Sequence, residues 1–253
     1  MKNVAISILA ISGFTVLFSC KNDVKNSEES QAVVADSIPA ETIPEFMYVT
    51  AVSGLTLREF PNLQSAKLAV MPLGTKVKIV NAEGKNTMNV GGIDGAMDEV
   101  EFNNKKGFVF NGFMSKFFPP EQDASAKNYA EELKKDFSNV NYSEETGGTA
   151  SKPTKTETLI LPTNTWHEAF FTAQQLFAIP KAFAFPNPKG SNNETQQNGN
   201  KKKTDFTSEL KISRNDNELQ KIVYNYKTTG FGYNVTITKE TDGMKLEKVE
   251  VVD

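Results

Sequence analysis

The sequence predicts a mostly β protein with two folded units. The first is a small β-barrel over residues 47–118, and the second is an α+β domain over 119–253 in which one or two helices cover an antiparallel meander. Short alternating segments broken by glycine, proline and asparagine predict the barrel. Apolar residues at helical spacing near 126–137 and 165–177 predict the helices. Alternation with period two across 206–251 predicts a sheet with one solvated face.

The first 19 residues have the pattern of an export signal. Lys2 precedes an apolar run that ends at Phe18 and is too short to span a bilayer, which takes about 20 residues. Leu17-Phe18-Ser19-Cys20 resembles the lipobox of bacterial lipoproteins, and Cys20 is the only cysteine in the chain. The resemblance implies cleavage before Cys20 and a lipid anchor, palmitate included, on the mature protein. The alternative is an ordinary secretory signal with an incidental cysteine.

Residues 20–46 are predicted to be a flexible tether, because this acidic, polar stretch has too little apolar surface to fold. The chain carries a formal net charge of −3, so it has no global positive field that would attract nucleic acid. With one cysteine and one histidine, His167, it can form neither an internal disulfide nor a Cys/His metal cluster. We therefore expect no metal and no cofactor.

Three turns divide the predicted barrel: Ser53-Gly54, Pro72 to Thr75, and Asn103-Asn104. Three elements of this segment resemble the bacterial SH3-like (SH3b) family, over about 70 residues. They are Val49 to Arg58 with Pro61-Asn62, Leu73 to Val77 with Ile79, and Lys105 to Phe110 with Phe113-Met114. One departure is that Gly95-Ala96-Met97 stands where the family commonly has Gly-Trp, so a tryptophan of the ligand groove is missing.

The resemblance implies a non-catalytic domain that binds cell-wall peptides or other extended ligands. Aromatic side chains can cover the apolar part of such a ligand, and an arginine can bind its carboxylate. The candidate ligand-binding residues are Tyr48, Arg58, Phe60, Phe108, Phe110 and Phe113. The alternative is that these aromatic residues fill the barrel core and that Arg58 braces the turn before Pro61. Asp94 and Asp98 are a weaker indication of a cation site than of a solvated loop.

The C-terminal half begins with a predicted helix from Ala126 to Phe137, stabilised by a Glu131–Lys135 pair. Two strands, 139–146 and 154–162, are predicted to be joined at Gly147-Gly148. The second helix is predicted to start at a capping box between Thr165 and Glu168 and to stop at Pro180. Trp166 is expected in the core and His167 on the surface.

Residues 187–203 are predicted to be a disordered polar loop. Phe183 and Phe185 are expected either to cover the helix end or to be exposed for a partner. Asp242-Gly243 predicts a tight hairpin, and a change of phase along the last strand predicts a bulge near Glu247-Lys248. This half resembles no family that we recognise.

The chain lacks a nucleophile elbow, a phosphate-binding glycine loop, an H-E-x-x-H motif and a dinucleotide fingerprint, so we expect no enzyme and no catalytic residue. A pair of glycosidase carboxylates is not excluded by sequence. The favoured hypothesis is an envelope lipoprotein that holds peptidoglycan or an extended peptide. The alternative is an assembly lipoprotein that docks on another envelope protein through its C-terminal domain. Cys20 is not followed by aspartate, so we expect the outer membrane.

Overall fold

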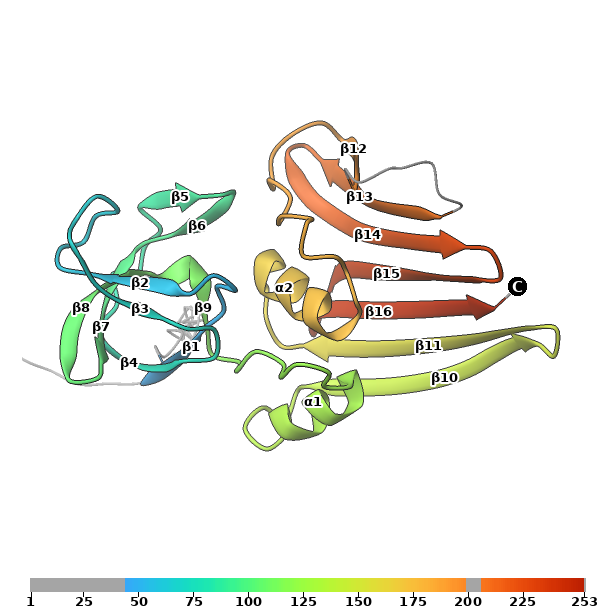
Figure 1. Ribbon diagram of the computed structural model, residues 1–253, viewed down its shortest axis with the longest axis horizontal. Coiled ribbons are helices and arrows are strands. Elements are labelled where there is room, and N and C mark those ends of the chain that lie inside the picture. Colours follow the sequence, from blue (N-terminus) through green and yellow to red (C-terminus); the bar gives the residue numbers. More distant parts are fainter. Residues whose placement is uncertain (1–43, 199–205, 253) are drawn as a thin grey trace, which may run out of the picture. The chain divides into compact units, whose positions relative to one another are not determined.

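The computed structural model describes residues 44–198 and 206–252, which belong to one compact unit spanning Thr42–Asp253. The export signal, Cys20 and most of the expected tether lie outside the described residues. The prediction of a mostly β protein with antiparallel sheets is confirmed: the described chain has sixteen strands, two α-helices and one short 3-10 helix (Figure 1). Within this part of the chain, no helix has the length and apolarity needed to cross a membrane.

The first sheet has seven short strands in the order β3-β2-β8-β7-β4-β1-β9. Their bounds are β1 Phe46–Val49, β2 Leu55–Arg58, β3 Lys67–Met71, β4 Lys76–Asn81, β7 Met97–Phe102, β8 Lys105–Phe110 and β9 Met114–Ser115, with the 3-10 helix Asn111–Phe113 before β9. A separate hairpin consists of β5 (Met88–Val90) and β6 (Ile93–Gly95). The sheet packs on its own small core, which comprises Val49, Leu55, Leu57, Met71, Val77, Val100, Val109 and Met114.

The three predicted turns of this segment are present. At the β7–β8 turn, Asn103 and Asn104 both have positive φ, 49° and 59°. Asparagine tolerates this conformation better than most residues, and two such residues in succession form the type of turn whose twist suits a two-residue hairpin. The local chemistry of the sequence therefore accounts for this connection.

The second sheet is an antiparallel array of seven longer strands in the order β10-β11-β16-β15-β14-β13-β12. Their bounds are β10 Asn141–Thr149, β11 Lys152–Leu161, β12 Asn193–Gln197, β13 Thr207–Asn215, β14 Glu218–Thr228, β15 Phe231–Glu240 and β16 Gly243–Val252. Helices α1 (Ala126–Leu133) and α2 (Trp166–Leu176) lie at one end of these strands (Figure 1). The shared core includes Leu159, Leu161, Phe170, Ala173, Phe177, Leu210, Ile222, Val235, Ile237 and Leu246.

The predicted capping box of α2 is wrong. The side chain of Thr165 makes no capping bond. Instead the hydroxyl of Thr163 donates to the Glu168 carboxylate and accepts from the backbone N–H of Thr165 at 3.1 Å. The residue two positions earlier therefore organises the start of the helix, because its hydroxyl reaches both groups. Trp166 is only partly buried against the core.

Helix α1 is shorter than expected but buries the predicted face, including Tyr129 and Leu133. Ser125 caps it by accepting the backbone N–H of Asn128 at 3.1 Å. The predicted pair is corrected: Lys135 contacts Glu132 at 2.6 Å rather than Glu131. Lys135 lies beyond the last helical residue, so the four-residue spacing assumed for the pair does not apply there.

Three predictions for the second sheet are also corrected. Gly147 and Gly148 lie inside β10, and the turn to β11 falls after them. No bulge occurs near Glu247, since β16 pairs without a shift of register with both β11 and β15. The apolar phase changes because Leu246 and Val249 face opposite sides of the sheet. The final hairpin turns at Thr241-Asp242, as Glu240 pairs with Gly243.

The polar segment 187–203 is not one irregular loop. Residues Asn193–Gln197 form the edge strand β12, which pairs with β13 from Asn193↔Ser213 to Gln197↔Glu209. Its polar sequence has no apolar alternation because neither face of this edge strand is buried in the core. Residues 199–205 lie outside the described part. Phe183 and Phe185, at 4% and 8% exposure, are core residues and are not exposed for a partner.

Candidate functional site

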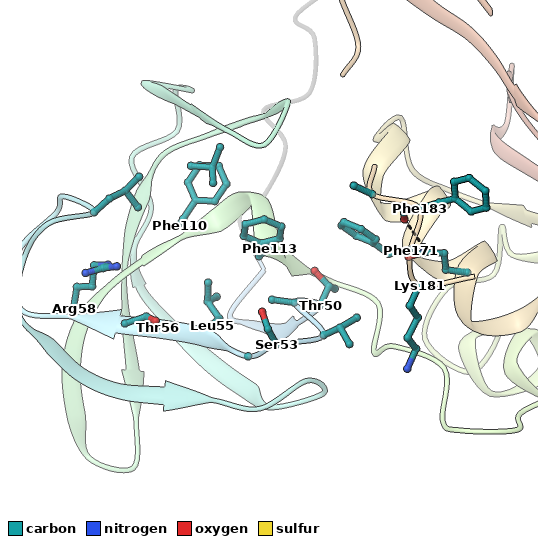
Figure 2. Close-up of a pocket in the computed structure, with 17 residues that line it drawn as sticks. Thr50, Ser53, Leu55, Thr56, Arg58, Phe110, Phe113, Phe171, Lys181 and Phe183 are labelled. Atoms are coloured by element: carbon teal, nitrogen blue, oxygen red, sulfur yellow. Dashed lines mark hydrogen bonds between the residues drawn. The ribbon is translucent and has the colours of Figure 1, made fainter. Parts of the chain in front are cut away.

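An open cavity of about 510 Å³ lies within the compact unit (Figure 2). One wall comes from the chain between β1 and β2 together with β2 itself. The opposite wall comes from α2 and the segment that follows it. The lining residues are Thr50 to Thr56, Arg58, Leu63, Val90, Phe110, Phe113, Phe171, Gln174, Lys181, Phe183 and Ala184.

The wall from Thr50 to Thr56 is held by backbone contacts. Thr50 N–H donates to the carbonyl of Phe113 at 2.9 Å, and Gly54 N–H donates to the carbonyl of Ala51 at 2.9 Å. Gly54 has φ +84°, and a Cβ atom there would lie 2.9 Å from a Val70 side-chain carbon. Only glycine combines this conformation with this close approach, so the turn predicted at Ser53-Gly54 fixes the shape of the wall.

Phe110 and Phe113 form an aromatic floor. Their ring centroids are 5.6 Å apart in an edge-to-face arrangement, which is a favourable geometry for aromatic pairs. Phe110 is 3% exposed, whereas Phe113 is only half-buried. A Cβ atom on Gly95 or Gly112 would come within 2.7 Å or 2.5 Å of the Phe110 ring. Two glycines therefore make the space that this ring occupies.

The second wall is fixed by Gln174 on α2. Its amide donates to the carbonyls of Pro180 at 3.2 Å and Phe183 at 2.8 Å. These bonds hold the segment that carries Lys181, whose side chain is exposed. Figure 2 shows Lys181 and Arg58 on separate walls of the cavity.

The charged side chains that line the cavity are both cationic. Arg58 is half-buried, and its Nη1 donates to the carbonyl of Ser65 at 2.8 Å, so only part of its donor set is used in that bond. Lys181 supplies a second positive charge. None of the described residues that line the cavity is acidic. The site therefore offers apolar aromatic surface, polar backbone and hydroxyl groups, and two cations, which together suit a ligand that carries carboxylates.

The structure brings three of the predicted ligand-binding residues to this cavity: Arg58, Phe110 and Phe113. The other three do not line it. Tyr48 stacks edge-on against Phe118 with centroids 6.1 Å apart, Phe60 is 57% exposed elsewhere, and Phe108 packs against the core. Arg58 also bonds to the carbonyl of Ser65 and so bridges the segment that contains Pro61, rather than a turn before it.

Sequence reasoning missed the whole second wall: Phe171, Gln174, Lys181, Phe183 and Ala184. These residues lie more than 50 positions after Phe113, and no local motif marks them as neighbours of the first sheet. Cys20 lies outside the described residues, so its predicted lipidation stays a prediction.

His167 is not the surface residue that was expected. It is partly buried, with its ring 5.9 Å from that of Phe185 and 6.4 Å from that of Phe171, both edge-on. Burial lowers the pKa of His167 to about 4, and a hydrogen bond with the backbone of Gly112 opposes this only in part. At neutral pH the imidazole is therefore uncharged, and it joins α2 to the 3-10 helix of the first sheet.

The two carboxylates weighed as a cation site have protein partners. Asp94 accepts from the Asn89 side chain at 2.7 Å, and Asp98, which is buried, accepts from the backbone of Glu83 at 3.1 Å. Among residues 44–198 and 206–252, no group of three or more His, Cys, Asp or Glu side chains is placed to hold a metal.

The fold and the cavity thus define a mostly β protein with an open, cationic, aromatic-floored pocket. Comparisons of the chain with protein-family models, curated proteins and solved structures found no match.

Proposed function

We propose that this protein is a lipid-anchored lipoprotein of the bacterial envelope, and that its cavity holds an extended, carboxylate-bearing peptide such as the peptide part of peptidoglycan, without transforming it. The observation that carries the proposal is the lining of the cavity. Arg58 and Lys181 stand on separate walls, on either side of the Phe110 and Phe113 rings, and no acidic residue is among the described lining.

Each part of such a ligand has a counterpart in the cavity. Apolar side chains of a peptide can lie on the aromatic floor, while its amide groups meet the backbone of Thr50 to Thr56. Carboxylates separated along the peptide can reach Arg58 at one wall and Lys181 at the other. The described lining holds no histidine, cysteine or carboxylate that could activate its serine and threonine hydroxyl groups as a general base. Binding without catalysis is the function that this chemistry supports.

The anchor is proposed from the sequence. Cys20 lies at the lipobox-like site, and lysine rather than aspartate follows it. A lipidated Cys20, most simply in the outer membrane, would leave residues 21–43 as the connection to the folded unit. The SH3-like resemblance of residues 47–118 supports the same placement, since the family commonly binds cell-wall peptides.

The proposal is tested with peptides released from purified peptidoglycan by an amidase, so that no sugar is present. We expect Arg58→Gln and Lys181→Gln each to weaken binding by about five- to tenfold, the loss of one charge-assisted contact. Lys67→Gln on β3, an exposed lysine that does not line the cavity, is the matched control. Thermal unfolding of each variant checks the fold, because Arg58 also bonds to Ser65. Equal binding by all four proteins would contradict the proposal.

One observation still supports the alternative, an assembly lipoprotein. Strand β10 is an edge of the second sheet, and nearly all of its nine residues are exposed. Such an edge can accept a strand from a partner. The Phe183/Phe185 segment no longer serves this alternative, because both rings are buried. Photo-crosslinking from Ser143 in living cells distinguishes the two, since a single envelope protein captured there supports assembly.

A further inference from the structure

A second surface lies on the helix-bearing face of the second sheet, beyond the helices. Alternation places Leu246 and Met244 of β16 under α2, while the far ends of the same strands extend past the helices (Figure 1). This far end carries Tyr226, Phe231 and Tyr233. Phe206 leads into β13 beside them. We call these four residues the aromatic platform.

The rings of the platform contact one another across β14, β15 and the residue that precedes β13. Tyr226 and Tyr233 are cross-strand partners with centroids 5.2 Å apart and planes inclined by 32°. Phe231 lies 6.0 Å from Tyr233, and Phe206 lies 6.2 Å from Tyr226. Phe206 is 41% exposed and the other three are partly exposed. The platform therefore offers a contiguous aromatic surface to solvent rather than isolated apolar residues.

A row of paired charged side chains, two lysines and three glutamates, borders the platform. Lys248 contacts Glu250 at 2.5 Å, and its Nζ lies 5.0 Å from the centre of the Tyr233 ring. In β11, Lys155 contacts Glu144 at 3.2 Å and Glu157 at 3.8 Å. Register places Glu250 opposite Tyr233 and Lys248 opposite Glu157, so this row continues the same face of the sheet.

We propose that the aromatic platform binds a neutral carbohydrate chain. A pyranose ring has an apolar C–H face that stacks on aromatic rings and a polar rim of hydroxyl groups. The rings of Tyr226, Tyr233 and Phe231 can stack on the C–H face of the sugar. The adjacent lysine and glutamate side chains can donate hydrogen bonds to its hydroxyl groups and accept hydrogen bonds from them. Both lysines of this row are held in ion pairs with its three glutamates, so the row offers no unpaired cation for an anionic ligand. An apolar surface of a partner protein fits this face less well, because its binding would remove water from the ion pairs that border the platform, which is costly.

This inference concerns a different surface from the peptide cavity and does not depend on it. The test uses the full chain with three neutral hexasaccharides: β-1,4-linked N-acetylglucosamine, β-1,4-linked glucose and α-1,4-linked glucose. Isothermal titration calorimetry gives the Kd, and saturation-transfer NMR identifies which sugar protons lie against the protein. We expect at least one hexasaccharide to bind, with the strongest transfer to ring C–H protons.

The test variant is Phe206→Ala on the platform. Its matched control is Phe60→Ala, which removes an exposed phenylalanine between β2 and β3. We expect Phe206→Ala and Phe231→Ala to weaken sugar binding at least fivefold, and Phe60→Ala and Lys181→Gln to leave it unchanged. Phe231→Trp retains binding, which separates a stacking role from mere support of the fold. Absence of binding to all three sugars at millimolar concentration would overturn the inference, as would equal affinity of the wild type and both platform alanine variants.

Discussion

Arg214 and Glu194 form an ion pair of 2.8 Å in which the Arg214 side chain is completely buried. The guanidinium also donates to the carbonyl of Asn187 at 2.7 and 3.1 Å and to that of Ser191 at 2.9 Å. The amide of Gln196 and the guanidinium of Arg214 hold the pKa of Glu194 below its usual value. One buried cation thus ties the segment before β12, and β12 itself, to β13.

Arg214→Gln should therefore destabilise the protein strongly. It removes most donors from this cluster, so Glu194 and the carbonyls of Asn187 and Ser191 lose their shared partner, which we expect to cost about 3 kcal/mol of unfolding free energy. Glu194→Gln is the comparison, because it keeps a neutral acceptor at a partly exposed position, and we expect a loss of only about 1 kcal/mol. Urea unfolding followed by circular dichroism measures both. Similar losses in the two variants would show that the backbone contacts of Arg214 contribute little.

Stability should fall in mildly acidic solution because of His167. The pKa of this side chain is about 4 in the folded protein and 6.5 in a reference peptide, since burial disfavours the charged form. The unfolded chain therefore binds a proton first as the pH falls. The contribution of neutral His167 is complete above pH 6.5 and declines progressively down to about pH 4, by at most about 3 kcal/mol.

His167→Gln isolates this effect, as the chain has no other histidine. Urea unfolding between pH 4 and pH 7 should show a shallower loss of stability for His167→Gln than for the wild type. The remaining slope belongs to carboxylates, which both proteins share. Parallel stability curves would contradict the assigned burial of His167.

The glycine at the start of β16 is predicted to be indispensable. Gly243 has φ +136°, and a Cβ atom there would lie 2.0 Å from the carbonyl oxygen of Leu161. Gly243→Ala should cost more than about 2 kcal/mol, since backbone strain and a backbone clash add together. Gly230→Ala is the control: it has φ +81° but nothing within 4 Å of the added atom, so strain alone applies. Thermal melting should rank the wild type above Gly230→Ala and Gly230→Ala above Gly243→Ala.

Lipidation can be tested directly at Cys20. In bacteria fed labelled palmitate, the wild-type protein should carry the label and fractionate with membranes, whereas Cys20→Ser should carry none. Cys20→Ser should also be released from the membrane fraction, because the sequence offers no second thiol for acylation. An unlabelled wild-type protein, or a labelled Cys20→Ser variant, would refute the proposed anchor.

Local patterns predicted much of the fold. The alternation around Leu210, Ile222 and Val235 placed the long strands of the second sheet, and helical spacing located the buried faces of α1 and α2. The turn at Asn103-Asn104 followed from the conformational tolerance of asparagine. Predictions that depended on the exact partner of a side chain were less successful. The capping box failed because Thr163, rather than Thr165, contacts Glu168.

The candidate site likewise contains some residues that could be predicted from sequence and others that could not. Arg58, Phe110 and Phe113 could be chosen from sequence because they sit in motif-like segments of the first sheet. Phe171 and Lys181 could not, because only packing in three dimensions brings them opposite Arg58. The aromatic platform also depends on strand register, since Tyr226 and Tyr233 lie on neighbouring strands and Phe206 immediately precedes a third.

The sequence by itself determined the mostly β class, the two helices, the long strands of the second sheet and the export-signal pattern that leads to Cys20, because each of these depends on neighbouring residues. The tertiary structure alone decided that His167 is enclosed by aromatic rings, that Phe183 and Phe185 are buried, and that β12 completes the second sheet. The physical reason is distance along the chain. Periodicity and turn chemistry act over a few residues, whereas burial and charge pairing depend on segments that only folding brings together.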